Sequence, residues 1–291
     1  MGEAIVIGLI EAAPLILAAV GFTIIYYLNG FINVAYGESV TIGAYITLVF
    51  NVFLGWNLYL ALIPAALLAG LFSVVTFVTV FRPAFRRRVG YIEMIILSVG
   101  LSFLIRHGIR LIFGLQSYQL ELTDPSYLTV FGTGVTSTQL VSIGLVAAVT
   151  TGLYLLVYRT RYGEQVRAFA SNRDLAMLSG ISPSRVALVV WFIAGASAGL
   201  AGTFTATLAF VDFEIGWEMI LILILISIVG GIGNVRGALA AGVIVGLVRS
   251  FVTIETATPI YGEVLLLAIF IIFLRLRTTR LSQRVLSFGR S

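Results

Sequence analysis

Residues 39–81 read SVTIGAYITLVFNVFLGWNLYLALIPAALLAGLFSVVTFVTVF and contain no charged side chain. A transmembrane helix needs roughly 20 mostly apolar residues, so this segment is long enough for more than one crossing. Gly55-Trp56-Asn57 is the turn signal within it. The segment therefore predicts two membrane helices joined by a short turn.

The apolar pattern continues along the chain. Of the 291 residues, 59% are apolar and 11% are charged, with a mean hydropathy of +1.07, whereas a soluble domain carries about 25% charged residues. We expect an all-α polytopic transmembrane bundle in which residues 1–291 form one domain. It should contain about eight to ten membrane segments, with about nine as the central estimate and some of them broken or short. The predicted segments are 4–28, 33–51, 58–80, 91–113, 138–158, 186–210, 217–233, 238–252 and 263–276.

The composition excludes several classes of chemistry. All 18 basic residues are Arg, Cys is absent, and His107 is the one His. A P-loop lysine, a lysine Schiff base, a thiolate nucleophile and a His-rich metal site are therefore excluded. The Arg residues fall in short clusters between apolar segments, which is unlike the basic face of a nucleic-acid-binding domain. We expect no catalytic residue, no metal, no cofactor in this chain and no nucleic acid partner.

The Arg residues also predict orientation. Arg106, Arg110 and Arg249 fall on one side of the predicted bundle and the others on the opposite side, which the positive-inside rule makes cytoplasmic. The N-terminus is then outside and the C-terminus cytoplasmic. Arg106 and Arg110 are expected to snorkel, to pair with Glu121 or Asp124, or to contact an extracytoplasmic protein. The cytoplasmic set is Arg82, Arg86, Arg87, Arg88, Arg159, Arg161, Arg167, Arg173, Arg185, Arg236, Arg275, Arg277, Arg280, Arg284 and Arg290.

Residues 159–185 form the one sizeable cytoplasmic segment of this prediction. Its apolar spacing predicts two short helices, Glu164–Ala170 and Arg173–Leu178. Asn172 is placed to cap the second helix and Gly180 to end it. The segment is either an amphipathic linker on the membrane surface or a docking element for a cytoplasmic partner.

Three stretches together resemble one protein family. They are NGFINVAYGESVTIGAY (residues 29–45), the cytoplasmic segment from Gly163 to Ile181, and VGGIGNVRGA (residues 229–238). In order and spacing, over nearly the whole chain, the sequence is similar to permease subunits of ABC importers for branched-chain amino acids and related substrates.

The resemblance implies a transport subunit in a prokaryotic plasma membrane. It implies translocation of branched-chain or other hydrophobic amino acids by alternating access, and membrane lipid as surroundings. The implied partners are a second permease, identical or related, two cytoplasmic ATPase subunits that use ATP, and an extracytoplasmic substrate-binding protein. This chain itself has no nucleotide-binding motif and is not expected to be an enzyme.

Other functions remain open from the sequence. The family commonly has His where this chain has Tyr36, so urea or short-chain amides stay as alternative cargoes. A stand-alone ion-coupled secondary transporter would need buried acidic relays, for which Glu38 and Glu11 are the candidates. A membrane-embedded structural subunit without transport is a third class.

In the family the cytoplasmic segment couples the permease to the ATPase. A short helix seated in a groove needs small residues for close approach and apolar residues as anchors, and the segment supplies both, with charges at the rim. The predicted coupling residues are Gly163, Glu164, Arg167, Ala168, Phe169, Ala170, Asn172, Arg173, Asp174, Leu175, Ala176, Leu178 and Gly180.

The candidate translocation residues lie in the first stretch. Glu38 is the sole charge between Ala12 and Phe81, and a carboxylate at the bilayer centre costs about 2.5–3.5 kcal/mol on insertion scales. Glu38 is expected either to line the pathway or to fix helix packing. Irregular backbone at this depth also has to be buried or to line a cavity. The predicted set is Asn33, Tyr36, Gly37 and Glu38.

Glycines mark predicted close contacts between helices. The turn from Gly230 to Gly237 is Gly-rich, but without a preceding strand or a Lys it is a tight hairpin and not a phosphate loop. Two small-xxx-small patterns predict packing faces. The predicted packing residues are Gly195, Gly199, Gly230, Gly231, Gly233, Gly237, Gly242 and Gly246.

Overall fold

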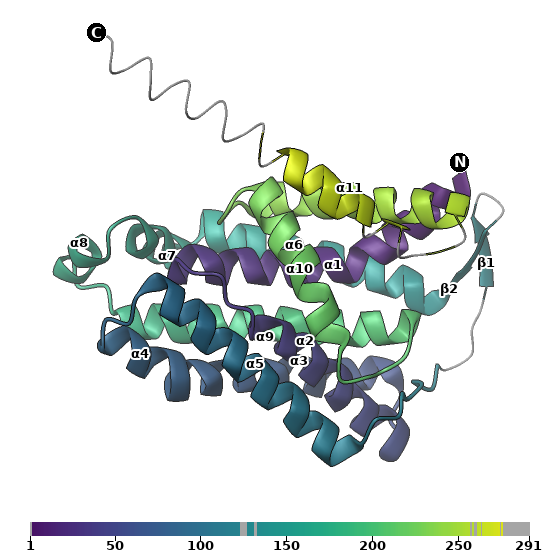
Figure 1. Cartoon of the computed structure of the whole chain (residues 1–291), viewed down its shortest axis with the longest axis horizontal. Helices are drawn as coiled ribbons and strands as arrows, with labels where there is room; N and C mark the ends of the chain where they lie inside the picture. Colours follow the sequence, from purple (N-terminus) through teal and green to yellow (C-terminus); the bar gives the residue numbers. More distant parts are fainter. Residues whose placement is uncertain are drawn as a thin grey trace, which may run out of the picture.

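The computed structural model describes residues 2–122, 127–130, 133–256, 258, 261–262, 264–273 and 275. Figure 1 shows a bundle of helices that run mostly along the long axis of the molecule. The helices are α1 (Gly2–Asn29), α2 (Tyr36–Leu48), α3 (Leu58–Thr76), α4 (Arg82–Arg86), α5 (Tyr91–Phe113), α6 (Ser137–Arg159), α7 (Arg161–Ser171), α8 (Arg173–Leu178), α9 (Pro183–Leu208), α10 (Ile215–Gly230) and α11 (Val235–Thr256). Two π-helical segments, η1 (Val49–Phe53) and η2 (Phe77–Phe81), continue α2 and α3.

Six helical stretches in the described part of the chain are long and apolar enough to cross a membrane. They are Gly2–Asn29, Leu58–Arg86, Tyr91–Phe113, Ser137–Arg159, Pro183–Leu208 and Val235–Thr256. Two shorter apolar helices, Ile215–Gly230 and Val264–Phe273, accompany them. The prediction of a polytopic α-helical bundle with some short segments is confirmed, and about nine segments is an approximate count.

The boundaries of several segments differ from the prediction by a few residues, most clearly at α2 and α11. The segment expected at 33–51 begins three residues later, as α2 followed by η1, and α2 is mostly buried within the bundle. The segment expected at 238–252 is the longer helix α11. The Asn234 side chain accepts a hydrogen bond of 3.2 Å from the Gly237 amide and so caps α11 at its start. The segment expected at 263–276 overlaps the helix Val264–Phe273, and residues 263, 274 and 276 lie outside the described residues.

Helices α1 and α9 form the centre of the fold. α1 packs against α11, α9, α6 and α10, and α9 packs against α3 and α2 as well (Figure 1). Both helices are rich in Ala and Gly, which allow close approach of the backbones. The buried Trp191 ring of α9 lies 5.2 Å from the Phe77 ring and 5.1 Å from the Phe81 ring, which joins α9 to η2.

The sequence prediction missed a β-hairpin. Strands β1 (Tyr127–Val130) and β2 (Thr133–Thr136) pair antiparallel, with Val130 opposite Thr133. The apolar composition of this region hid the strands, but its Thr and Val residues favour extended backbone. Thr136 then caps α6 by accepting a hydrogen bond of 3.3 Å from the Gln139 amide.

The Arg-bearing turns gather at one end of the bundle. Figure 1 shows α4, α7 and α8 at the end opposite the hairpin. The α10–α11 turn lies at that end too, because the Gly233 amide donates 3.0 Å to the Thr23 hydroxyl near the end of α1, and the Tyr158 hydroxyl of α6 lies 3.4 Å from the Gly233 carbonyl. We call this the Arg-rich end.

Candidate coupling surface and translocation site

Helices α7 and α8 are defined by local capping. The Thr160 side chain accepts a hydrogen bond of 3.1 Å from the Gly163 amide and begins α7, and the Asn172 side chain accepts one of 3.0 Å from the Leu175 amide and begins α8. Gly180, with φ at +82°, ends α8 in the left-handed conformation that favours glycine. The sequence predicts α8 with both of its end residues, whereas α7 begins three residues before the predicted Glu164 and its Thr160 cap was not predicted.

One face of α7 is held against the bundle. Val166 and Phe169 are buried in the core. A Cβ at Gly163 would overlap the end of α6, so this glycine serves the contact between α6 and α7. The Tyr162 hydroxyl donates a hydrogen bond of 2.9 Å to the Arg185 carbonyl, and burial raises the pKa of the Tyr162 hydroxyl. The Arg167 guanidinium also donates to the Val157 carbonyl.

α8 presents apolar side chains outward. Leu175 is 61% exposed and Leu178 is 85% exposed, and Met177 beside them is also exposed. Ala176, by contrast, is buried toward the bundle. A helix that shows leucines to solvent at the Arg-rich end is typical of a protein interface.

The thirteen predicted coupling residues therefore divide by exposure. The bundle itself buries Gly163, Phe169 and Ala176 and half-buries Arg167 and Ala170. The side chains of Arg173 and Asp174 lie outside the described part of the structure. The residues left exposed to a partner are Glu164, Ala168, Asn172, Leu175, Leu178 and Gly180.

The predicted translocation residues lie where α1 gives way to α2. Gly30, with φ at +75°, ends α1, and Asn33 is 1% exposed in the turn that follows. Neither polar atom of the Asn33 side chain has a hydrogen-bond partner among the described residues. The Val34 amide donates 3.1 Å to the Ser98 hydroxyl of α5. Asn33 is thus buried within this irregular segment, whereas Gly30 before it is exposed.

Tyr36 joins three helices. Its hydroxyl lies 2.9 Å from the Ala18 carbonyl of α1 and 3.1 Å from the Ala194 carbonyl of α9, so it can donate to either. The ring packs edge-on at 5.5 Å from Phe22. Tyr36 therefore holds α2 against the two central helices.

Glu38 is fully buried and hydrogen-bonded. The Ser102 hydroxyl of α5 donates 2.7 Å to one carboxylate oxygen, and the Thr41 hydroxyl donates 3.3 Å to the other. The Thr41 oxygen in turn accepts a hydrogen bond of 3.1 Å from the Gly216 amide of α10. The guanidinium of Arg106 acts on the carboxylate electrostatically. One buried network thus connects α2, α5 and α10.

Arg106 was expected to snorkel, to pair with Glu121 or Asp124, or to contact an extracytoplasmic protein, and its burial contradicts snorkelling. It is 5% exposed, and its guanidinium lies 4.7 Å from the centre of the Phe103 ring and 4.3 Å from that of Trp217. Ser98, Ser102 and Arg106 share one face of α5, at i, i+4 and i+8. That buried polar stripe was the sequence signal that could have paired Arg106 with Glu38.

The predicted glycines sit at helix contacts. Gly195 and Gly199 of α9 face Ala65, Ala69 and Ser73 of α3, and Gly242 and Gly246 of α11 face Ala12 and Ile16 of α1. Gly230 and Gly237 meet each other across the α10–α11 turn, and Gly231 and Gly233 have positive φ. Gly37 contacts Gly216, which brings α2 against α10 beside the Glu38 network.

Among the described residues no three His, Asp or Glu side chains gather where they could hold a metal ion. The site contains a buried polar network that connects α2, α5 and α10, and the leucines of α8 are exposed at the Arg-rich end.

Comparison with known proteins identifies the family. The profile described as "Branched-chain amino acid transport system / permease component" matches residues 4–274. The chain is 27% identical to the probable branched-chain amino acid transport permease LivH of Methanocaldococcus jannaschii, over 93% of this chain and 90% of that one. It is 25% identical to the high-affinity permease LivH of Escherichia coli K12, over 90% and 89%.

More distant relatives carry other names. A guanosine ABC transporter permease of Bacillus subtilis is 24% identical, over 88% of this chain and 83% of that one. No solved structure matches the chain significantly. With the profile covering nearly all of its length, this multi-pass membrane protein belongs to the permease component family of the branched-chain amino acid transport system.

Proposed function

We propose that the chain is the membrane-spanning permease subunit of a binding-protein-dependent ABC importer. In this proposal residues 1–291 act as one permease domain beside a second permease, identical or related. Separate cytoplasmic ATPase subunits use the ATP, and an extracytoplasmic binding protein delivers the substrate. The family match over residues 4–274 supports the role.

The observation that carries the mechanism is the two-sided structure of the α7–α8 segment. Leu175 and Leu178 of α8 are exposed, whereas Val166 and Phe169 of α7 are buried in the bundle. A partner that binds α8 and moves would therefore also move α7, together with the end of α6 and the start of α9 that pack against it. In alternating access this segment is the element through which ATP-driven closure of the ATPases reaches the membrane helices.

We propose that the Glu38 network is the part of the membrane bundle that rearranges when the ATPases close. Its hydrogen bonds cross from α2 to α5 and from α2 to α10. A buried charge with this many fixed partners holds the helices in one arrangement, and a second arrangement has to provide other partners. We propose that Asn33, Gly37 and Glu38 border the pathway in at least one state of the cycle.

Orientation follows from the Arg-rich end. The turns with Arg82–Arg88, the α7–α8 segment and Arg236 lie at that end, which supports a cytoplasmic assignment by the positive-inside rule. The N-terminus is then extracytoplasmic and the C-terminus cytoplasmic, in a prokaryotic plasma membrane.

Branched-chain or other hydrophobic amino acids are the proposed cargo. The named cargo of the LivH relatives supports this, while the guanosine permease relative shows that similar chains carry other names. Urea and short-chain amides remain the alternative cargoes. An ion-coupled transporter is the alternative class, and it would move substrate without ATPase partners.

The deciding experiment is reconstitution in liposomes with and without the ATPase subunits, the second permease and the binding protein. The proposal expects leucine uptake only when ATP is present on the side of the membrane that carries the ATPase subunits and binding protein is present on the opposite side. Uptake by the chain alone under an ion gradient contradicts it. Competition by isoleucine, valine, urea and acetamide then ranks the cargoes.

A further inference from the structure

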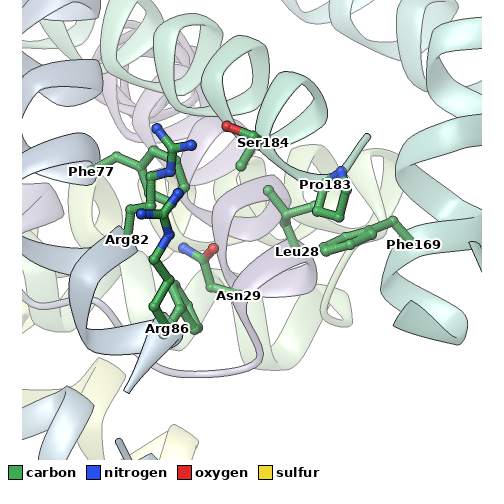
Figure 2. Close-up of a pocket in the computed structure, with 10 residues that line it drawn as sticks. Leu28, Asn29, Phe77, Arg82, Arg86, Phe169, Pro183 and Ser184 are labelled. Atoms are coloured by element: carbon green, nitrogen blue, oxygen red, sulfur yellow. The ribbon is translucent and has the colours of Figure 1, made fainter. Parts of the chain in front are cut away.

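A pocket at the Arg-rich end is not used by the proposed transport mechanism. It has a volume of about 220 Å³ and lies between the end of α1, the η2–α4 junction, α7 and the start of α9. Figure 2 shows Arg82, Arg86 and Asn29 on one side of it and Leu28, Pro183 and Phe169 on the other. The pocket is smaller than the roughly 300–1,000 Å³ of sites for drug-sized ligands, so it suits one small group.

The polar side of the pocket is rich in hydrogen-bond donors. Arg82 and Arg86 stand one turn apart on α4, and like charges at this spacing repel each other. The amide nitrogen of Asn29 is buried and has no hydrogen-bond partner in the described part of the chain. None of the lining residues is acidic. Unpaired donors beside two cations call for an anion.

The start of α9 adds to the positive field. Pro183 and Ser184 are its first residues and both line the pocket. Pro183 has no amide hydrogen, and the preceding Ser182 makes no side-chain capping hydrogen bond, so no Ser182 cap satisfies the amides that follow Pro183 in this 26-residue helix.

The other side of the pocket is apolar, and a long apolar helical stretch ends beside it. Leu28, Pro183 and Phe169 form this side, and Phe77 lies beside the arginines (Figure 2). Arg82 and Arg86 end the long apolar stretch Leu58–Arg86, on which Val75 and Val78 are exposed. A charged group held here would have a hydrocarbon environment directly beside it.

We propose that this pocket binds the phosphate group of an anionic glycerophospholipid, with Arg82, Arg86 and Asn29 as its donors. Basic pockets at the cytoplasmic side of transmembrane helices suit such headgroups. The bound phosphate ties α1, α4 and α9 together next to α7. The proposal depends neither on the cargo nor on the ATPase partner.

The test measures lipid retention by the purified full-length chain. Native mass spectrometry in detergent is run with equal amounts of dioleoyl phosphatidylglycerol and dioleoyl phosphatidylcholine. The wild type is expected to retain phosphatidylglycerol preferentially. The double variant R82Q/R86Q is expected to bind it roughly ten-fold more weakly or worse, since each basic residue near the surface contributes to this attraction.

A matched control separates the pocket from general charge. R87Q/R88Q removes the same charge from the same turn, at residues that do not line this pocket, and should leave retention unchanged. Equal loss in both double variants, or no loss in R82Q/R86Q, overturns the proposal.

A second variant distinguishes loss of the lipid site from misfolding of the chain. Asn29→Asp keeps the size and both arginines but places a carboxylate where the phosphate would lie, so it should lower phosphatidylglycerol retention while the melting temperature holds or rises. Undiminished retention in Asn29→Asp contradicts the proposal.

Two further outcomes concern the source of the anion. Inorganic phosphate at millimolar concentration that binds as tightly as phosphatidylglycerol rejects the lipid as ligand. If R82Q/R86Q retains the lipid but no longer co-purifies with ATPase subunits, the pocket serves an acidic side chain of that partner and the lipid proposal fails.

Discussion

The carboxylate of Glu38 accepts a hydrogen bond of 2.7 Å from the hydroxyl of Ser102 across the contact between α2 and α5. Both side chains are fully buried. The hydrogen bond stabilises a buried carboxylate, which is costly within a membrane. It also connects the short helix α2 to α5, whose opposite face is exposed.

Ser102→Ala removes this donor and leaves a carboxylate oxygen short of a partner. We expect a loss of about 1–3 kcal/mol in stability, seen as a lower melting temperature in detergent, together with slower uptake. Ser227→Ala is the matched control, because the Ser227 hydroxyl is buried without a hydrogen-bond partner among the described residues. If both variants melt alike, the Glu38–Ser102 bond has no energetic role.

Tyr36→Phe deletes the hydroxyl that lies between the Ala18 and Ala194 carbonyls. We expect destabilisation by about 0.5–1.5 kcal/mol and an unchanged order of preference among cargoes, since the hydroxyl is occupied by backbone. The control is Tyr45→Phe, whose hydroxyl is buried without a partner in the described structure. A changed cargo preference in Tyr36→Phe would place this residue in the pathway instead.

Gly43→Ala tests the contact between α2 and α9. The new Cβ would lie 2.6 Å from the Gly199 carbonyl carbon, and neither backbone can yield cheaply. Overpacking of this kind costs about 1–3 kcal/mol. Gly144→Ala, on an open face of α6, should instead stabilise by about 0.5–1 kcal/mol through helix propensity. In thermal unfolding experiments we expect the melting temperature to fall in Gly43→Ala and to rise in Gly144→Ala.

Asn172→Ala removes the side-chain cap of α8. A lost cap costs about 1 kcal/mol, enough to fray a helix of this length, so the exposed leucines lose their fixed spacing. We expect weaker co-purification of ATPase subunits, with Asn172→Asp restoring it because aspartate caps equally well. Equal binding by the Ala and Asp variants would show that the order of α8 is irrelevant to docking.

The sequence was most informative where structure is decided locally. Asn172 and Gly180 could be assigned as start and end of α8 because capping and left-handed backbone depend on neighbouring residues. Apolar length likewise predicted the bundle and most of its segments. The hairpin was missed because Thr and Val serve strands as well as membrane helices.

The candidate site needed tertiary information. Glu38 stood out as a lone charge, but which helix satisfies it depends on the rotation of α5, which brings Ser102 and Arg106 inward. In the same way Phe169 and Leu178 look equivalent in the sequence, and only the packing of α7 and α8 on the bundle buries the first and leaves the second exposed. The spacing of apolar residues indicates that a helix has two different faces, but it does not identify which part of the protein packs against each face.

The central claim is that α8 is the surface on which the ATPase docks. The chain has no Cys, so Leu178→Cys gives a single thiol on that surface. In the assembled transporter we predict that this thiol crosslinks to an ATPase subunit and is labelled by a membrane-impermeant maleimide only from the cytoplasmic side, whereas Leu111→Cys at the far end of α5 does not crosslink. Labelling of Leu178→Cys from outside intact cells would contradict the account.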